Sequence, residues 1–566
     1  MTKVSRRQAL AILGAGAGGL AAVYATGASS KEGASSQPAA KGDHFRHGVA
    51  SGDPDASSLI IWTRITTDLP ELDVTWRVAA DPGFTELAAS GTVRTGSAND
   101  WTVKPLVTGL QAGRVYFYQF TAQGDPSPIG RTRTLPAVGP DRLGIALASC
   151  SNFAFGHFNA YGAIAKDEDI DFVLHTGDYI YEYGGADSWG EKTGAAIGRR
   201  HLPAHETVTL QDYRTRHAQY KSDEGSQAMH AAHPLLCCWD DHESTNNPWK
   251  DGAQNHQADT EGSWQTRRAA SVQAYYEWMP IREPEAGRTR LEFWRTYVFG
   301  DLATLVTLET RHTARGMQID YETWKPKLEA SQDYESFRRD VIGDPDRAML
   351  SPGMEDALRS ALSHSREINQ PWRLIGNASP IARMLVPDLV GAGVLEAPGA
   401  DALDAHTRLA WLGQHRLPFY TDTWDGYPAA RERFYDLCKS VDVQDLIVLT
   451  GDSHSFWLNT LADAAGNPMG VELGTAGITS PGDFVESGFS HEQSSALDAA
   501  FADLLDEVVW TDNSHQGYVR LVLETGQART DFVAVRTVLQ PDLHTRILRT
   551  SALFPASVTV RLADAG

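Results

Sequence analysis

Two stretches of the chain place an aspartate directly after a short apolar run and follow it with a second residue that could bind a metal. In the first, Asp178 follows the run VLHTG and is followed by Tyr181; in the second, Asp452 follows LIVLTG and is followed by His454. A carboxylate just beyond the carboxyl end of a buried strand lies where open α/β sheets build their sites. A single Gly-Asp pair also makes an ordinary turn. Two copies, one extended by tyrosine and the other by histidine, predict a shared metal centre.

Two other predicted strands end in the same way. Cys150 follows the run LGIALAS, and Asp240, Asp241 and His242 follow PLLCCW. If all four strands are neighbours in one sheet, their ends bring carboxylate, imidazole, thiolate and phenolate groups together. A bound cation explains such a gathering, because like-charged carboxylates otherwise repel one another. Any one of these residues alone is better explained as a core, turn or capping residue, but four strand ends with one layout favour a metal site.

The composition is that of an ordinary soluble globular protein. The chain has 566 residues, of which 42% are hydrophobic and 22% charged, and its length predicts two or three domains. A formal net charge of −22 argues against a nucleic-acid-binding surface and against binding to anionic lipid. The four cysteines are too few for a disulfide framework in a chain this long.

Residues 1–30 are predicted to be a targeting segment that is not part of the fold. Lys3, Arg6 and Arg7 precede a stretch rich in glycine and alanine. The letters S-R-R-Q-A-L resemble a twin-arginine export signal, which implies the twin-arginine machinery as a partner and a periplasmic or secreted location. The stretch is too weakly hydrophobic for a membrane anchor, and residues 31–43 are predicted to be a linker.

Two folded parts are predicted after the linker. Residues 44–137 have short β-branched and aromatic runs between turn signals, which predicts an antiparallel β-sandwich like an immunoglobulin or fibronectin module; this part lacks a titratable cluster. Residues 138–566 alternate apolar runs with amphipathic stretches, which predicts a mixed α/β sheet covered by helices. A glycine-rich loop at 183–207 is either a cover over the site or a surface excursion.

The individual elements are predicted from the same runs. Strands are expected over 58–65, 73–80, 102–110, 114–122, 143–149, 171–176, 234–239, 302–308, 372–376 and 445–450, within 518–538, and over 553–562. Helices are expected near 210–231, 263–279, 354–366, 404–415 and 428–440.

Three motifs resemble those of the calcineurin-like metallophosphoesterases: G-D-Y-I-Y, W-D-D-H-E at Trp239–Glu243 and G-D-S-H at Gly451–His454. The chain departs from the general pattern of that superfamily. It has A-S-C-S around Cys150 in place of D-x-H, Tyr181 in place of the second aspartate of GDxxD, and Asp241 in place of the asparagine of GNH. These departures are the pattern of the PhoD family of alkaline phosphatases and phosphodiesterases. The segments HGVASGDP, IIWTR, LQDYRTRHAQY and WDGYPAARER extend the resemblance over nearly the whole chain after the targeting segment.

The resemblance implies a catalytic domain of two packed sheets flanked by helices, with an iron(III) and calcium centre. The implied iron ligands are Cys150, Asp178, Tyr181 and His454; phenolate and carboxylate are hard donors that suit a small trivalent ion. The implied calcium ligands, all oxygen donors, are Asp178 as a bridge, Asp241, Asp425 and Asp452. Asp425 is also explained as a cap at a helix start, and whether Asp240 binds metal is left open.

The implied reaction is hydrolysis of a phosphate ester by in-line attack of a metal-activated hydroxide, with release of phosphate. His242 is implied to contact the phosphoryl oxygens or to protonate the leaving group. A serine nucleophile is not required, and the chain has no G-x-S-x-G motif. Three alternatives remain open: a phosphodiesterase or phospholipase D-like enzyme on the same centre, a non-catalytic exported binding protein, and an exported redox metalloprotein that uses Cys150 and Tyr181 on iron.

Overall fold

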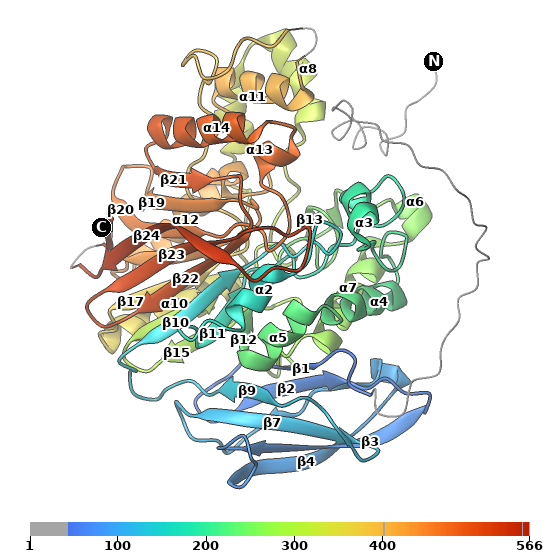
Figure 1. The fold of residues 1–566 in the computed structure, drawn as a ribbon. Coiled ribbons are helices and arrows are strands. Elements are labelled where there is room, and N and C mark those ends of the chain that lie inside the picture. The colour runs from blue at the N-terminus through green and yellow to red at the C-terminus, as the bar shows by residue number, and fades with distance from the viewer. Residues whose placement is uncertain (1–43, 400–401, 557–558, 565–566) are drawn as a thin grey trace, which may run out of the picture.

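The computed structural model describes residues 44–399, 402–556 and 559–564. The predicted targeting segment and linker, 1–43, lie outside these residues. Two large sheets pack face to face with helices outside both, and a smaller sheet lies at the N-terminal end, drawn blue in Figure 1. None of the described helices is long and apolar enough to cross a membrane.

An eleven-stranded sheet carries three of the four predicted strand ends. Its central strands β10 (Leu143–Ala148), β11 (Phe172–His175) and β12 (Leu235–Cys237) are parallel, so their carboxyl ends lie at one edge. On one side the sheet continues through β22 (Gly517–Leu523), β23 (Ala528–Val535), β24 (Thr545–Phe554) and β25 (Arg561–Asp564). On the other it continues through β1 (Val49–Gly52), β2 (Leu59–Arg64) and β5 (Thr102–Val103), with β6 (Leu106–Val107) also paired to β2.

The fourth strand end belongs to a second, seven-stranded sheet. Its order is β15 (Thr296–Phe299), β16 (Ala303–Thr307), β17 (Trp372–Gly376), β18 (Leu446–Thr450), β20 (Pro468–Gly474), β19 (Phe456–Ala462) and β21 (Val508–Asp512). The strands from β16 through β17 and β18 to β20 are parallel. The condition that all four strands are neighbours in one sheet is therefore not met, because β18 lies in the opposite sheet.

Side-chain alternation along the strands builds the interface between the two sheets. In β10, Leu143, Ile145 and Leu147 share a core with Leu374 of β17 and Ile447 of β18. The alternate residues of β10 pack in a different core, against helices. Successive side chains of a strand point to opposite faces, so a strand that is apolar throughout must be covered on both sides, as these are.

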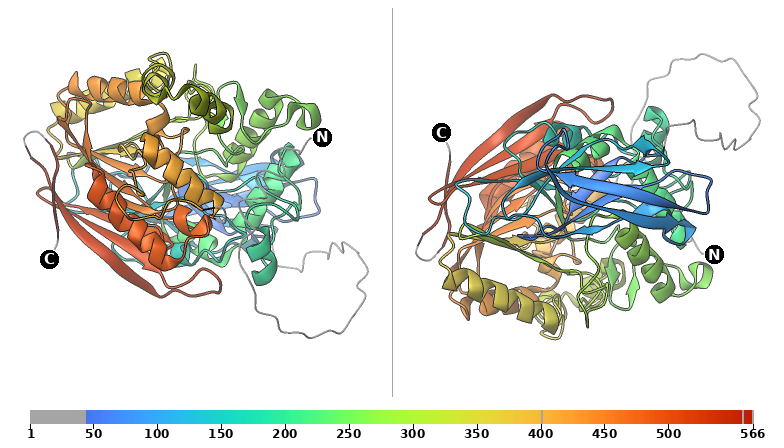
Figure 2. Two further views of the ribbon diagram at one scale, coloured as in Figure 1. Left: turned by 90° about the horizontal axis from the view of Figure 1, so that it is seen from above. Right: turned by 90° about the horizontal axis from the view of Figure 1, so that it is seen from below.

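Helices cover the outer faces of both sheets. The eleven-stranded sheet is covered by α2 (Asn159–Ile164), α4 (Leu210–Lys221), α5 (Glu224–Ala232) and α7 (Trp264–Trp278). The seven-stranded sheet is covered by α10 (Pro352–Glu367) and α12 (Pro428–Lys439). Figure 2 shows the red C-terminal strands and the yellow helices on opposite sides of the molecule. The expected architecture of two packed sheets flanked by helices is confirmed.

A third group of helices forms a separate cluster, at the top of Figure 1. It consists of α8 (Tyr321–Ser331), α11 (Asp404–His415) and α14 (His491–Leu504), with the short α13 (Asp483–Glu486) beside them. The helices α8 and α14 were not predicted from the sequence.

The N-terminal sandwich shares one of its sheets with the large body. Its own sheet contains β4 (Leu87–Gly96), β3 (Glu71–Ala79), β7 (Val115–Ala122), β8 (Asp125–Pro126) and β9 (Gly130–Arg133). The opposing layer is the end of the eleven-stranded sheet, and Ile61, Val74 and Tyr118 meet in the core between them. Strand β1 pairs with β12 through Gly52 and Leu235, so hydrogen bonding is continuous across the predicted boundary at residue 137.

Two predicted strands differ in detail from the structure. The stretch 102–110 forms the two short strands β5 and β6 instead of one. The stretch 553–562 spans the end of β24 and the start of β25, which pair as antiparallel neighbours at the sheet edge.

Asp53 ties the sandwich side of the sheet to the large body. Its buried carboxylate accepts hydrogen bonds from the backbone N–H of Arg282 (2.8 Å) and from Nε of Arg295 (3.0 Å). Its φ of 46° also lies in the left-handed region, which aspartate tolerates better than alanine. Asp53→Ala is therefore expected to lower the free energy of unfolding by about 3 kcal/mol in urea denaturation, because it leaves a mostly buried arginine without its partner.

Asp73→Ala is the control for this prediction. Asp73 pairs with Arg94 at 3.3 Å, but its side chain is 61% exposed. A change within about 0.5 kcal/mol is expected there. Equal effects of the two substitutions would contradict the structural role of Asp53.

Candidate metal centre

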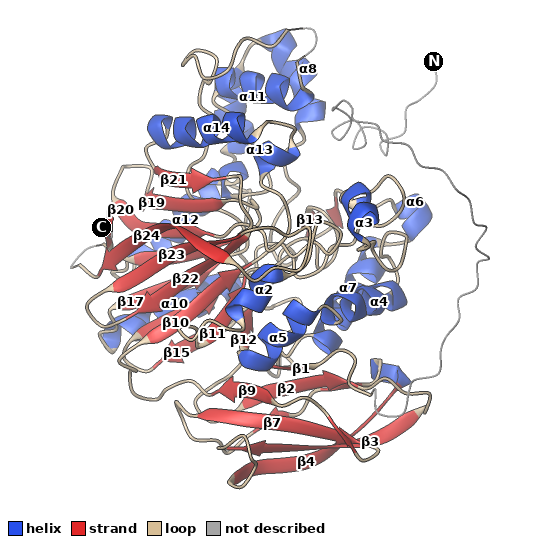
Figure 3. Cartoon of the chain, in the orientation of Figure 1, coloured by secondary structure: helices blue, strands red, loops and turns tan. Residues whose placement is uncertain are grey.

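Loops from both large sheets bring the predicted ligands together beyond the strand ends. Figure 3 shows these loops gathered between the strands and the helices α7 and α3 (Glu191–Ile197). Three groups of side chains each hold their ligand atoms within 4.8 Å of one another: Cys150, Asp178 and His454; Asp178, Asp241 and His242; and Asp240, Asp241 and Asp452. The groups form a connected series, because Asp178 belongs to the first two and Asp241 to the last two.

Tyr181 joins the first group through its hydroxyl. That hydroxyl donates to Asp178 Oδ2 at 2.9 Å, lies 3.3 Å from His454 Nε2, and accepts a hydrogen bond from Ser480 Oγ at 2.9 Å. Burial, and then the charge of Asp178, raise the pKa values of Tyr181 and Cys150 well above their usual ranges. Both groups therefore carry protons in the absence of metal, and a bound cation would displace them.

Arg311, which is not among the residues predicted from the sequence, is the one arginine that reaches into the carboxylate groups of the described site. It follows β16, is 1% exposed in its side chain, and pairs with Asp240. Its other nitrogens lie 3.0 Å from Asp422 and 3.5 Å from Asp452. The rule that drew attention to the other strand ends also applies here, because the predicted strand 302–308 leads directly to this residue.

The donor set fits multivalent cations. Burial raises the pKa values of Asp178 and Asp452 well above their usual ranges, and it raises that of Asp240 to about 6 although Arg311 opposes the shift. One buried oxygen of Asp240 and one of Asp241 have no hydrogen-bond partner among the described residues. Three buried carboxylates and the partly buried Asp452 exceed what Arg311 and His242 can neutralise, since Glu182 also pairs with His242, so additional positive charge is required to keep them ionised.

The imidazole of His454 is in the neutral form that can bind a metal ion. Burial lowers its pKa to about 3, which leaves the neutral imidazole that binds metals. The indole of Trp189 stacks on its ring, with centroids 5.6 Å apart and planes at 16°.

Four of the proposed ligands have a backbone conformation that is unusual for residues other than glycine. The φ angles of Cys150, Asp178, Asp452 and His454 are 60°, 55°, 67° and 54°. Such conformations cost free energy and persist where the surrounding structure enforces them, commonly at functional sites. These residues lie where the backbone leaves β10, β11 and β18, and the unusual conformation directs their side chains toward the candidate metal centre.

Glu182, a second residue that was not predicted from the sequence, orients His242. Its carboxylate lies 2.7 Å from His242 Nδ1 and also accepts hydrogen bonds from Thr245, Asn246 and Asn255. Although burial raises the pKa of Glu182, His242 and these donors lower it to about 2. Burial alone lowers the pKa of His242, but the surrounding carboxylates, Asp241 and Glu182 first, raise it well above its usual range.

Glu243 fixes the two loops that carry the carboxylates. Its side chain is buried and accepts hydrogen bonds from the backbone N–H groups of Asp178 (3.1 Å), Tyr179 (2.5 Å) and Asp240 (2.8 Å). A single side chain thereby sets the spacing between the loops after β11 and β12.

Asp425 is not brought into any of the three groups. Its carboxylate accepts hydrogen bonds from Arg431 (2.7 Å) and from the backbone N–H of Met384 (2.8 Å), so both oxygens already have protein partners. In the same stretch of sequence, Asp422 is the residue that reaches the carboxylates, through its ion pair with Arg311.

The glycine-rich loop at 183–207 lies over the site as a cover. Besides stacking on His454, Trp189 packs at 5.6 Å from the ring of Tyr181. Its indole N–H donates to Glu486 at 2.6 Å, which ties the loop to the segment around α13. Of the two alternatives for this loop, the cover is the one that these contacts support.

Comparisons with known proteins agree with this geometry. The model of the PhoD-like phosphatase family matches residues 145–532, and that of the PhoD-like phosphatase N-terminal domain matches residues 29–136. Alkaline phosphatase D of Bacillus subtilis (strain 168) is 32% identical over 516 residues, which cover 88% of this chain and 78% of that protein. The solved structure of PhoD superposes with a TM-score of 0.73 at 28% identity, over 94% of both chains.

Replacing Asp178 with asparagine is expected to remove at least about half of the bound metal, because this carboxylate belongs to two of the three groups. Metal analysis of the purified variant measures this, with circular dichroism to confirm the fold. Asp425→Asn also neutralises a buried carboxylate, and it is expected to keep the full metal content. A full metal content in Asp178→Asn would contradict the site, and metal loss in Asp425→Asn would show that Asp425 is a ligand after all.

Proposed function

We propose that the chain, which belongs to the PhoD-like phosphatase family and is a phosphoric ester hydrolase, hydrolyses phosphate esters at the three linked groups of side chains. The observation that carries the proposal is the connection of these groups through Asp178 and Asp241. Two neighbouring cations sharing carboxylates are a recurrent arrangement for hydrolysis of phosphate esters, since together they bind the attacking and leaving oxygens.

The donor types divide the centre into two ion sites. Iron(III) is proposed for the side with Cys150, Tyr181 and His454, and calcium for the all-oxygen side with Asp241 and Asp452, with Asp178 shared between them. On geometric grounds Asp240 replaces Asp425 in the calcium set, because it shares a group with Asp241 and Asp452. When bound, these ions lower the pKa of coordinated water and offset negative charge on the phosphoryl oxygens.

His242 is proposed as the proton donor to the leaving oxygen. The carboxylate of Glu182 lies 2.7 Å from Nδ1 and raises the pKa of the ring, and Nε2 lies 3.8 Å from Asp241. Arg311 is proposed to hold the carboxylates Asp240 and Asp452 in register. Its Nη2, which faces Asp452 at 3.5 Å, makes no hydrogen bond with the described residues, and its N–H groups are suited to a phosphoryl oxygen.

Export by the twin-arginine machinery to the periplasm or the exterior is part of the proposal, and it rests on Arg6 and Arg7 in the sequence. This pathway carries folded proteins, which agrees with a metal centre assembled before export. Replacing both arginines with lysine in the native host is the corresponding test, and undiminished export of that variant would contradict the assignment.

One experiment tests both the hydrolytic activity and the preference for phosphate monoesters or diesters. Protein recovered from the exported fraction of the native host is analysed for iron and calcium and assayed on p-nitrophenyl phosphate and on bis(p-nitrophenyl) phosphate. Hydrolysis of either ester, abolished when the metals are chelated, is expected. Hydrolysis of the diester alone would favour a phosphodiesterase. If neither ester is hydrolysed by the metal-loaded protein, a binding or redox role for the centre would replace the proposal.

Glu182→Gln is expected to lower kcat about 10- to 100-fold, in the range found for partners that orient catalytic groups. Glu182 raises the pKa of His242, so its neutralisation lowers that pKa. The protonated form is then lost at lower pH, and the alkaline limb of the kcat/KM profile moves to lower pH. If Glu182 acts through His242, adding Glu182→Gln to His242→Gln costs nothing further. Additive losses would contradict the pairing.

A further inference from the structure

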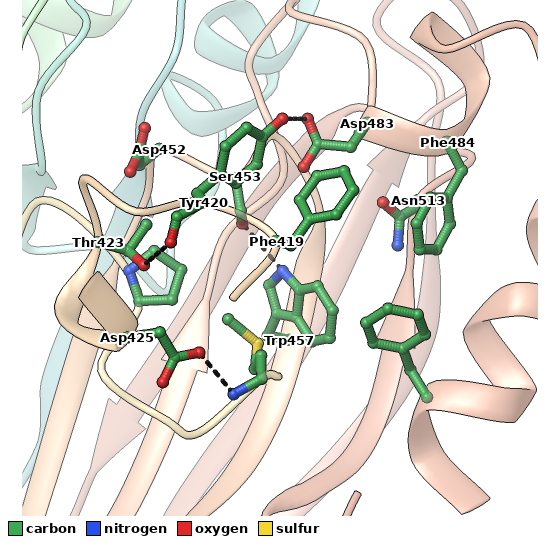
Figure 4. A pocket seen from close by; sticks show the side chains of 13 residues that line it. Phe419, Tyr420, Thr423, Asp425, Asp452, Ser453, Trp457, Asp483, Phe484 and Asn513 are labelled. Atoms are coloured by element: carbon green, nitrogen blue, oxygen red, sulfur yellow. Dashed lines mark hydrogen bonds between the residues drawn. The ribbon is translucent and has the colours of Figure 1, made fainter. Parts of the chain in front are cut away.

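A cavity opens beside the proposed calcium side of the centre. Its free space is about 500 Å³ when the open solvent at its mouth is included. Figure 4 shows Asp452 and Asp425 on one side of this cavity and the rings of Trp457 and Phe484 on the other. Asp452 is thus both a wall of the cavity and a member of a proposed metal group.

The far walls of the cavity are apolar and come from separate parts of the chain. Phe419 precedes the short helix η4 (Trp424–Gly426), Trp457 lies on β19, Phe484 on α13 and Phe501 on α14. All four belong to or pack against the core cluster at the top of the molecule. Rings held in a core in this way present a preformed surface, which is the usual character of a ligand pocket.

The polar groups in the walls are held by neighbours. Trp457 Nε1 donates to Ser453 Oγ at 2.9 Å, and the Tyr420 hydroxyl donates to Asp483 at 2.7 Å. The side-chain amide of Asn513 donates to Asp498 at 2.6 Å. The cavity therefore offers few free groups for a polar ligand. The hydrogen-bonding capacity that remains lies mainly in carboxylate oxygens, which accept and do not donate.

The charge of the lining excludes a further class of ligand. None of its thirteen residues is a lysine or an arginine, whereas three of them, Asp425, Asp452 and Asp483, are acidic. A second phosphate or a carboxylate attached to the substrate would find no cationic partner in this lining. Substrates such as nucleoside diphosphates are thereby disfavoured, and an uncharged apolar substituent is favoured.

From this geometry we infer that the cavity is a subsite for the organic part of the substrate, and that it selects phosphate esters whose ester oxygen carries an aryl or short alkyl group. The inference rests on the proposed function, because it requires the phosphoryl group to lie at the groups that include Asp452. The apolar substituent then extends past this carboxylate onto the rings of Phe484 and Trp457.

The test compares two esters in three proteins, each loaded with metal. The esters are 2-naphthyl phosphate, with an aromatic substituent, and glycerol 2-phosphate, with a small polar one. Phe484→Ala is expected to lower kcat/KM for the naphthyl ester about tenfold and that for the glycerol ester less than about twofold, since removing apolar contact of this size costs about 10- to 200-fold in discrimination. Comparison of each variant with the unmodified protein cancels the different chemical reactivities of the two esters.

Phe489→Ala is the matched control. Phe489 is as buried as Phe484 (4% and 3% exposed) and belongs to the same core cluster, yet it does not line the cavity. It is expected to lose comparable stability while leaving the ratio of the two kcat/KM values unchanged. Inhibition by phenylphosphonate and methylphosphonate gives a readout of binding alone: only phenylphosphonate is expected to weaken, about tenfold, in Phe484→Ala.

The outcomes separate the two proposals. If the unmodified protein hydrolyses neither ester, the proposed function fails. If it hydrolyses both, and Phe484→Ala leaves the ratio of kcat/KM values and the phenylphosphonate inhibition unchanged, the function stands and the subsite is overturned. A change of the ratio in Phe489→Ala equal to that in Phe484→Ala would also overturn it, because the effect would then come from general loosening of the core.

Discussion

The structure depends on the burial of several carboxylates at one place, where their mutual repulsion must be offset. Asp178, Asp240, Asp241 and Asp452 lie within linked groups beyond the strand ends, and Arg311 is the fixed cation among them. Burial raises the cost of every unpaired charge. Bound cations would offset this repulsion. The loops that carry the carboxylates are fixed by backbone N–H groups that donate to Glu243 and to Glu182.

Packing of the two sheets is what makes this gathering possible. The strand β18 lies in a different sheet from β10, β11 and β12, so its Asp452 reaches the others only because both sheets share a core. Residues such as Ile145 and Ile447, in the core between the sheets, therefore help to set how closely the loop after β18 approaches the loops after β10, β11 and β12. The interior is close-packed and resists small displacements, which suits a site that must hold its ligands at fixed separations.

The sequence was informative where the signal is local. Runs such as LGIALAS and LIVLT are apolar on both faces and bounded by polar residues, and they form β10 and β18 within a residue or two of the expected limits. The same strand-end rule located most members of the three groups. It could not tell that β18 belongs to a different sheet, because which strands pair depends on contacts between distant segments.

Partners of the site residues were harder to predict than the residues themselves. Glu182 and Arg311 are ordinary charged residues in the sequence, and only the fold gives each of them its buried partner. Asp425 was predicted as a ligand from its motif, but the sequence did not reveal that Arg431 and the backbone N–H of Met384 already donate hydrogen bonds to its carboxylate. The continuity of the sandwich with the large sheet through β1 and β12 is likewise a long-range pairing that short patterns do not reveal.

The central claim is that two different ions lie side by side, one near Cys150 and the other near Asp452. Anomalous diffraction from crystals of the natively exported protein, recorded on both sides of the iron absorption edge, tests it most directly. The account predicts one iron peak within bonding distance of Cys150, Asp178, Tyr181 and His454, and a separate non-iron peak among Asp240, Asp241 and Asp452. A single peak, or metal confined to the protein surface, would contradict it.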